Sequence, residues 1–339
     1  MTRPPLTIGS ATARPGTTAE GELFVARQIS GTSVALPIRL VHGADDGPTV
    51  WISAAIHGDE IGGVEIIRRA MEVIDARTLA GSIIAVPIVN VFGFLGRSRY
   101  LPDGRDLNRS FPGSAKGSLA ARLANLFTTE VVDRSDVGID LHTGSDHRTN
   151  LPQIRADLDD PVTNDLAAAF GAPLNLHSRL RDGSLREIAV QRSARVLLYE
   201  AGEAHRFDSD PIDTGVDGVL RVLDHLEMTK QAIAPPAAPP LVSRDSRWIR
   251  ARRSGICTLD VDLGDQVERG DRLAVVRDAF GATVATAKAP SPGIVIGLTR
   301  HPLVNQGDAI IHLARLEADT PDGVSDHVAS SPTSTDTPS

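Results

Sequence analysis

The sequence is short of cysteine and of long apolar runs. Cys257 is its only cysteine, which excludes an intrachain disulfide and a metal site built from several thiolates, and a reducing cytoplasm fits it. No span of about 20 apolar residues occurs, so a membrane-spanning helix is excluded. Residues 1–21 carry prolines and polar side chains where a signal peptide needs an apolar stretch. We therefore expect a cytoplasmic protein without a membrane partner.

Basic residues are too few to balance the acidic ones. The chain has 35 Lys and Arg residues against 43 Asp and Glu residues, a formal net charge of -8. Nucleic acids and anionic membranes bind basic surfaces, so neither is expected as a main partner. With 41% apolar and 23% charged residues over 339 positions, the composition indicates a globular protein large enough for a catalytic domain and a smaller second one.

The order of the apolar runs predicts an α/β protein. Residues 20–43 alternate apolar and polar positions as two edge strands would, which leaves room for a homo-oligomer interface. From Thr49 on, β-rich runs alternate with amphipathic helical stretches, the pattern of a mainly parallel or mixed sheet flanked by helices. The strand candidates are TVWISAAI, SIIAVPIVNV, VGIDLH and RVLLYEA.

Composition divides the chain into five expected parts. These are a flexible N-terminus (1–18), a catalytic domain (19–232), a Pro-rich linker (233–243), a small β domain (244–317) and a disordered tail (318–339). The linker region AIAPPAAPPL would be stiff and extended. The β domain carries short strands broken by Gly-Asp turns, which predicts a small barrel or sandwich. The tail is rich in Ser, Thr, Pro and Asp.

Two histidines and a glutamate stand where predicted strands end. His57 and Glu60 lie in the segment HGDE after TVWISAAI, and His142 closes VGIDLH. Ligands gather at the carboxyl ends of strands in open α/β sheets, so these side chains are candidates to hold one metal ion. Two nitrogens, a carboxylate and a water form a common catalytic zinc set. The alternatives are a helix-capping acid at Glu60, structural histidines, and His147 in the loop SDHRTN as a rival ligand.

Arginines crowd the loop that follows SIIAVPIVNV. Within it, Asn108 and Arg109 offer directional donors and a planar fork that suit a substrate carboxylate. Arg97, Arg99 and Arg105 are candidates for a cation that polarises a scissile carbonyl, and their spacing does not choose among them. A solvated basic loop is the alternative for the whole segment.

A carboxylate ends the last of the predicted strands. Water activated by a metal still needs a base that takes its proton and an acid that returns the proton to the leaving nitrogen, and one glutamate can do both. Glu200, at the end of RVLLYE, is the preferred candidate. Glu203 lies beyond Gly202 and is the alternate base or a substrate contact. For either glutamate, a plain surface carboxylate is the alternative.

The four motifs HGDE, DLNRSFPG, DLHTG and YEAGE, in this order, resemble the succinylglutamate desuccinylase/aspartoacylase family, a branch of the zinc carboxypeptidase-like hydrolases. The resemblance covers about residues 45–230. It extends to the β domain, which resembles the biotinyl-lipoyl type of barrel that aspartoacylase-type members carry. The implied fold is a zinc carboxypeptidase-like sheet flanked by helices, followed by this small β domain.

The resemblance also implies roles for single residues. His57, Glu60 and His142 would bind one zinc ion per chain, Glu200 would activate the water, Asn108 and Arg109 would bind a substrate carboxylate, Asp106 would orient a ligand histidine, and Arg99 would polarise the carbonyl. The implied activity is hydrolysis of the amide bond in a small N-acylated, carboxylate-bearing amino acid, without a covalent acyl-enzyme. The lack of a G-x-S-x-G elbow in the sequence agrees with this.

Two rival functions stay open. A zinc carboxypeptidase would trim peptides, whereas the short catalytic segment and the added β domain favour a closed pocket for a small substrate. A non-catalytic binding protein that keeps the fold would lack a ligand or the base, and this sequence keeps His57, Glu60, His142 and Glu200. The motifs do not indicate the acyl group or the amine.

Overall fold

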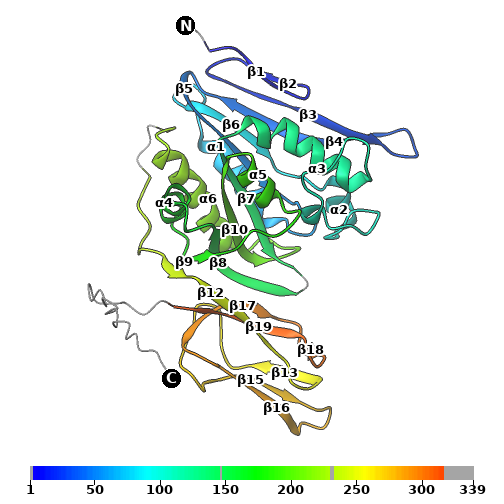
Figure 1. The fold of residues 1–339 in the computed structure, drawn as a ribbon, viewed down its shortest axis with the longest axis vertical. Coiled ribbons are helices and arrows are strands. Elements are labelled where there is room, and N and C mark those ends of the chain that lie inside the picture. Colours follow the sequence, from blue (N-terminus) through cyan, green and yellow to red (C-terminus); the bar gives the residue numbers. More distant parts are fainter. Residues whose placement is uncertain (1–2, 146, 230–232, 317–339) are drawn as a thin grey trace, which may run out of the picture.

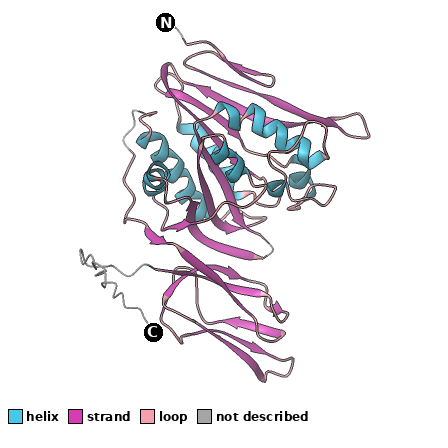
Figure 2. Cartoon of the chain, viewed as in Figure 1, coloured by secondary structure: helices cyan, strands magenta, loops and turns pink. Residues whose placement is uncertain are grey.

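The computed structural model describes residues 3–145, 147–229 and 233–316, and the expected tail at 318–339 lies outside them. Helices cover both faces of one large sheet, and further strands follow toward the C-terminus (Figures 1 and 2). The expected α/β fold, a mixed sheet flanked by helices with additional β-sheet at the C-terminal end, is confirmed. Of the helices in the described ranges, none combines the length and the apolar character that crossing a bilayer requires.

The main sheet has a parallel centre and antiparallel sides. Across it lie, in this order, β12 (Asp245–Arg250), β19 (Ala309–Arg315), β17 (Gly293–Thr299), β8 (Arg148–Ala156), β10 (Arg195–Glu203), β7 (Val137–Gly144), β5 (Asp45–Ala54), β6 (Ala80–Val86), β4 (Ser33–His42) and β3 (Thr17–Arg27). The strands β10, β7, β5 and β6 run parallel, and the remaining pairs along this path are antiparallel. Because parallel neighbours end at the same edge, the carboxyl ends of β5, β7 and β10 meet there.

Three short strands attach beside this path. β9 (Leu174–His177) pairs with β8 and with β11 (Leu241–Ser243), and β14 (Gln266–Val267) pairs with β17. Each contributes only a few pairs of residues to the ladder, so the order of the ten longer strands determines the shape of the sheet.

Two helical layers bury the sheet. α1 (Gly62–Val73), α4 (Pro161–Phe170) and α6 (Ser209–His225) pack on one face, while α2 (Val91–Gly96), α3 (Leu119–Glu130) and α5 (Leu185–Gln191) pack on the other. Ile52 and Ile139 join the first core and Trp51 joins the second. A strand buried on both faces must be apolar throughout, which explains why TVWISAAI and VGIDLH are continuous rather than alternating runs. Short 3-10 turns, η1 (Leu107–Arg109) and η2 (Val132–Arg134), lie in the connections.

Local sequence signals fix the ends of α4. The side chain of Asp160 accepts the amide of Thr163 at 2.9 Å, which satisfies a helix donor that has no partner inside the helix. Pro161 occupies the first turn, where its missing N–H costs nothing. Gly171 follows the helix with a φ of 73°, a conformation that glycine adopts without steric cost. These caps explain why the stretch PVTNDLAAAF folds as a helix over that range.

A second sheet lies toward the C-terminus. It contains β16 (Thr283–Lys288), β15 (Arg272–Arg277), β13 (Gly255–Leu259) and β18 (Leu303–Val304), in this order. Its Leu273 and Val276 pack with Val295 and Ile311 of the main sheet in a core of their own. The backbone of β17 also pairs with β8, so the main sheet continues without a break into the C-terminal strands. The division into two domains therefore stays a prediction.

Two expected boundaries differ from the structure. The segment 1–18, expected to be flexible, contains the hairpin of β1 (Leu6–Ile8) and β2 (Ala11–Ala13), and Ile8 and Ala13 are buried in the core that α3 also joins. Strands of three residues are too short to show a period in the sequence. The last three residues of the expected linker 233–243 form β11, because the backbone of Leu241 pairs with β9.

The closest packing at the centre of the sheet joins Trp51 and Gly138. The two residues are partners on the neighbouring strands β5 and β7, and a Cβ on Gly138 would lie 2.0 Å from an atom of the indole ring. The Trp51 side chain is fully buried. Only a residue without a side chain leaves room for that ring, so Gly138 keeps β5 and β7 in register.

Gly138→Ala should therefore destabilise the fold. The added methyl group has to displace a ring in a close-packed core, so we expect the free energy of unfolding, measured with urea, to fall by about 1–3 kcal/mol. Gly96→Ala is the control, because a Cβ there meets nothing within 4 Å. An unfolding midpoint of Gly138→Ala equal to that of the control would contradict this packing argument.

Candidate metal and substrate site

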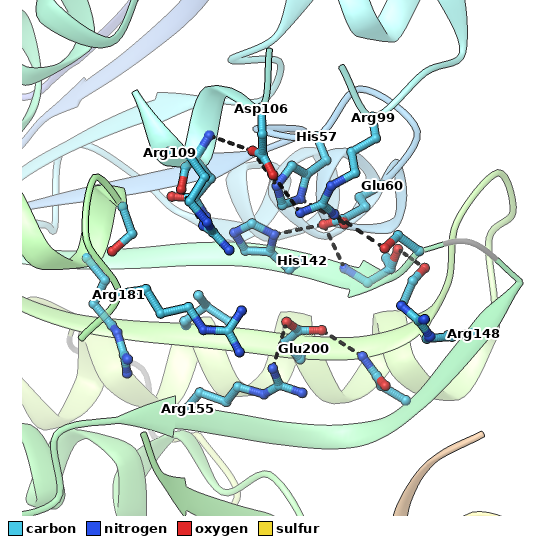
Figure 3. A pocket seen from close by; sticks show the side chains of 18 of the residues that line it. His57, Glu60, Arg99, Asp106, Arg109, His142, Arg148, Arg155, Arg181 and Glu200 are labelled. Carbon is cyan, nitrogen blue, oxygen red and sulfur yellow. Dashed lines mark hydrogen bonds and ion pairs between the residues drawn. The ribbon is translucent and has the colours of Figure 1, made fainter. Parts of the chain in front are cut away.

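The carboxyl ends of β5 and β7 bring the predicted metal ligands together. The chain leaves β5 at Ala54 and turns toward α1, and His57 and Glu60 lie in this turn, where the Glu60 amide donates to the His57 carbonyl at 3.1 Å. His142 lies on β7, one residue after Leu141, the partner of Ala54. Figure 3 shows the three side chains close together.

The Glu60 carboxylate contacts both histidines. Its Oε1 lies 2.8 Å from His57 Nδ1, and its Oε2 lies 2.7 Å from His142 Nδ1. All three side chains are buried, and one ligand atom from each lies within 4.8 Å of the others. Two imidazole nitrogens and a carboxylate oxygen in this arrangement form a group that could hold a metal ion.

A further carboxylate lies beside the outer nitrogen of each ring. His142 Nε2 lies 2.8 Å from Asp140, whose other oxygen accepts the hydroxyl of Ser53 at 2.8 Å. His57 Nε2 lies 3.3 Å from Asp106 Oδ1. Ligand histidines donate their second N–H to such carboxylates, which fixes the tautomer and leaves the inner nitrogen free to bind an ion. The donor set and its support therefore fit a divalent cation.

The charges of this group favour a cation. Burial lowers the pKa of both imidazoles, but Glu60 and Asp106 raise the pKa of His57 above its ordinary value, and Asp140 and Glu60 raise that of His142 well above it. Burial alone would raise the pKa of the Glu60 carboxyl, yet the two histidines hold it well below its usual range. A buried cluster with this balance attracts positive charge, whether protons or a metal ion.

Of the three candidate arginines, the structure brings Arg99 to the metal group. Its Nη1 lies 3.2 Å from Glu60 Oε1, and its Nη2 lies 3.0 Å from Asp106 Oδ2. Arg97 caps the end of α2 with a φ of 50°, and Arg105 pairs with a neighbouring aspartate at the surface. Contact with Glu60 therefore distinguishes Arg99 from the other two.

Asn108 and Arg109 lie in η1, directly after Asp106. Asn108 is buried, and its Oδ1 accepts the amide of Leu185 at the start of α5, at 2.9 Å. This contact leaves the amide nitrogen of Asn108 as a donor. The side chain of Arg109 donates to the Asn108 carbonyl and lines the same cavity as Arg99. An amide and a guanidinium side by side suit a carboxylate ligand.

Glu200 lies opposite His142 on the neighbouring parallel strand, β10. Its carboxylate is held between two donors, Asn150 Nδ2 at 2.6 Å and Arg155 Nη1 at 3.3 Å (Figure 3). Its side chain remains 16% exposed, so it is open to a ligand in the cavity. Glu203, the alternate base, lines a separate small hollow. The arrangement therefore brings Glu200, rather than Glu203, to the cavity that holds the metal group.

The alternative metal ligands lie elsewhere. His147 is exposed and packs against His301, with 5.3 Å between the ring centroids. A second group that could hold a metal consists of Asp157, Asp159 and His177, and it is partly exposed. In that group His177 Nδ1 already accepts a backbone amide at 3.3 Å, and Arg244 pairs with Asp159 at 2.6 Å. Among the described residues, the group around Glu60 is the better metal site.

A cavity of about 390 Å³ opens onto these side chains. Arginines outnumber carboxylates in its lining by six to three. They are Arg99, Arg109, Arg148, Arg155, Arg181 and Arg186, against Glu60, Asp106 and Glu200. Trp248 of β12 also lines it, so the C-terminal strands contribute to the wall. The excess of positive charge indicates an anionic ligand.

Arg186 is a buried cation that the sequence did not single out. It lies at the start of α5 and is 6% exposed; Nη2 donates to the carbonyls of Ser178 at 2.8 Å and Arg179 at 2.6 Å. Its Nη1 is buried and has no partner among the described residues. Burial, together with Arg155 and Arg181, lowers the pKa of Arg186 to about 10. A buried cation beside two others calls for an anion.

A signal for Arg186 does exist in the sequence. Ser184 accepts the amide of Glu187 at 3.2 Å, and Glu187 in turn accepts the amide of Gly183 at 2.7 Å, close to the capping box that S-x-x-E motifs form. The segment SLRE therefore predicts a helix start with Arg186 in the first turn. The helix dipole disfavours a cation at that end, so an arginine there points to a role other than helix stability.

Comparisons with known proteins identify the family of the chain. A model of the succinylglutamate desuccinylase/aspartoacylase catalytic domain matches residues 46–226, more than half of the chain. The N-alpha-acetyl-L-2,4-diaminobutyric acid deacetylase of Halomonas elongata is 28% identical over 297 residues, which cover 84% of this chain and 86% of the relative.

Solved structures share the fold over nearly the whole chain. The succinylglutamate desuccinylase/aspartoacylase of Rhodobacter sphaeroides superposes with a TM-score of 0.80 at 25% identity, covering 90% of this chain and 97% of that one. The product-bound ectoine utilization protein EutE of Ruegeria pomeroyi has a TM-score of 0.80 at 23% identity, covering 93% and 98%. The resemblance carried by the four sequence motifs is thus confirmed, and the chain belongs to the succinylglutamate desuccinylase/aspartoacylase family.

Proposed function

We propose that this chain is a zinc-dependent hydrolase that cleaves the amide bond of a small, anionic N-acyl amino acid. The observation that carries the proposal is that Glu60 and Glu200 line the same arginine-rich cavity. Two histidine nitrogens contact Glu60, and Glu200 lies on β10, next to the strand of His142. The Halomonas relative, which is named as a deacetylase of an N-acetyl amino acid, supports the reaction type.

His57 Nδ1, His142 Nδ1 and the Glu60 carboxylate would hold the zinc ion. When bound, zinc polarises a carbonyl and lowers the pKa of water to about 7. Glu200 takes the proton of the attacking water and returns it to the nitrogen of the departing amine. Asp106 keeps the ring of His57 in place and also holds Arg99.

Arg99 would stabilise the charge that develops on the carbonyl oxygen. Its guanidinium contacts Glu60 on one nitrogen and Asp106 on another, so it is held next to the metal group before substrate arrives. A donor fixed in advance spends little energy on reorganisation during the reaction. The remaining N–H groups of the fork are the ones that would face the substrate.

The remaining cations of the cavity would bind the carboxylates of the substrate. Asn108 of η1 contacts the start of α5, which carries Arg186. Arg181 lies near Arg109 and Arg155, so these cations share one part of the cavity. The unpartnered Nη1 of Arg186 supports an anion at that end, because a buried donor without an acceptor is costly. A substrate carboxylate bound there would satisfy this group of donors.

A small substrate is favoured over a peptide. The volume of about 390 Å³ is in the range of pockets for single small molecules. Trp248, from the C-terminal strands, lines the cavity and stacks on His312, with 4.6 Å between the ring centroids; Arg148 Cζ lies 5.2 Å from the centroid of the Trp248 ring. A rigid wall of this kind leaves little space for the extended chain that a carboxypeptidase must admit.

Metal analysis tests the ligand set. We expect one zinc ion per chain in the purified protein and loss of most of it in His142→Ala, because two ligands hold zinc much more weakly than three. His147→Ala is the matched control and should keep its zinc, since that ring packs on His301. Equal zinc content in both variants, measured by mass spectrometry, would rule out the proposed centre.

Release of the amine from a panel of N-acetyl and N-succinyl amino acids, run beside dipeptides, tests the reaction. We expect the acyl amino acids to be hydrolysed and Glu200→Gln to reduce kcat by about 100-fold or more while zinc stays bound. Glu203→Gln should retain turnover, because Glu203 lies outside the cavity. Full activity of Glu200→Gln would refute the mechanism, and faster cleavage of dipeptides would favour the carboxypeptidase.

Removing a cation from the cavity should weaken substrate binding. Arg186→Met leaves a substrate carboxylate without its charged partner, so we expect KM to rise by about 10-fold or more with a smaller change in kcat. Arg179→Met is the control, because only the backbone carbonyl of Arg179 takes part in this cluster. If KM stays the same in steady-state kinetics of Arg186→Met, the anion does not bind there.

A further inference from the structure

Asn150 connects the C-terminal strand β17 with Glu200. Asn150 lies on β8 between two neighbours, and its backbone pairs with Gly202 of β10 on one side and Gly297 of β17 on the other. Its side chain is buried, and Nδ2 donates to Glu200 Oε2 at 2.6 Å. This is the shorter of the two contacts that hold the Glu200 carboxylate.

A bulge in β8 brings Asn150 to that position. Glu200 is paired with Gln153, but Gly202 is paired with Asn150 instead of Leu151, so β8 carries one extra residue in this interval. Side chains alternate between the two faces of a strand, and without the extra residue Leu151 would lie on the face of Glu200. The bulge exchanges an apolar side chain for a hydrogen-bond donor beside the carboxylate.

The amide of Asn150 can present only one end to Glu200. An ionised carboxylate accepts hydrogen bonds and never donates them, so the nitrogen faces Glu200 and Oδ1 lies on another side. A Cβ built on Gly297 would lie 3.0 Å from that Oδ1 and 3.1 Å from the Cβ of His312. The bare backbone of Gly297 therefore leaves the space that the amide oxygen occupies.

The second partner of Glu200 holds it less tightly. Arg155 Nη1 lies 3.3 Å from Oε1, longer than the roughly 2.8 Å typical of a hydrogen bond between two ions. A neutral amide fixes the position of a carboxylate with a smaller loss of basicity than a second adjacent guanidinium would cause. The amide contact thus suits a group that must receive and return a proton.

We propose that Asn150 is a positioning residue for Glu200, and that β17 sets the orientation of its amide through Gly297. The inference rests on the proposed role of Glu200 as the base. The C-terminal strands would then contribute to the reaction as well as to the cavity wall. β17 pairs with β8 at the bulge, and the Asn150 side chain of β8 donates to the Glu200 carboxylate.

Asn150→Leu tests the contact by removing the donor while keeping the volume. We expect kcat on the best acyl amino acid of the panel to fall by about 10- to 100-fold, with KM changed by less than about 3-fold and zinc content unchanged. Asn175→Leu is the matched control. Asn175 is an even more buried asparagine on β9 whose Oδ1 has no partner among the described residues, so its replacement should leave kcat unchanged.

Asn150→Asp separates positioning from packing. The variant keeps the shape of the side chain but places a second carboxylate beside Glu200, and like charges raise the apparent pKa of the pair. The acid limb of the kcat profile should therefore move to higher pH. A purely structural role of Asn150 would leave the limb where it is in the wild type.

Gly297→Ala tests the link to β17. The added Cβ forces the amide oxygen to yield by a few tenths of an ångström, so we expect the same pattern as for Asn150→Leu, a lower kcat at nearly constant KM, but a smaller loss. A crystal structure of Asn150→Leu is a check that needs no substrate. In it the Glu200 carboxylate should have left its present position, for example toward Arg155.

The outcomes separate this inference from the proposed function. Full turnover by Glu200→Gln would overturn the base itself and this inference with it. If Glu200→Gln is inactive while Asn150→Leu keeps the kcat of its control and Asn150→Asp leaves the acid limb unmoved, the positioning role alone is refuted. Should Asn150→Leu fail to fold, Asn150→Asp and Gly297→Ala decide the question.

Discussion

The buried Glu60 carboxylate, placed between two imidazoles, is the interaction on which the rest of the site depends. A buried carboxylate is stable only if charges and hydrogen bonds replace the water it has lost. His57, His142 and Arg99 supply them, and they come from the turn after β5, from β7 and from the loop before η1. Arg99 and His57 also both contact Asp106. The contacts of Glu60 therefore join segments that lie far apart in the sequence.

The central fold and the metal group could be predicted because their signals are local. Strands buried on both faces are continuous apolar runs, and a histidine or glutamate at the end of such a run lies at the edge where parallel strands finish. His57, Glu60, His142 and Glu200 all carry this mark. Spacing alone could not choose the arginine that contacts Glu60, since three arginines share one loop; only the family resemblance pointed to Arg99.

The strand β8, which forms another wall of the cavity, has no comparable signal in the sequence. β8 carries Asn150 and Arg155, yet Pro152 lies within it, and proline argues against a strand with neighbours on both sides. The bulge resolves the conflict, because Pro152 lies in the interval where the register with β10 shifts and a ladder donor is not needed. The pairing of β8 with β17 joins positions about 150 residues apart, which no periodicity encodes.

The cavity combines two opposite electrostatic surroundings, and this combination explains how it would select a substrate. Around Glu60 the carboxylates outnumber the cations and favour a metal ion, whereas the far wall gathers Arg155, Arg181 and Arg186. A neutral peptide chain could offer Arg186 Nη1 a carbonyl oxygen but no negative charge, and Nη1 has no partner of its own among the described residues. A site that bonds a polar group of its ligand discriminates strongly against ligands without that group. An apolar pocket discriminates less against a ligand that is one methylene shorter. Selection against uncharged substrates would thus follow from the cost of leaving buried guanidinium groups without a counter-charge, while the proposed metal group would act on the amide that the arginines hold.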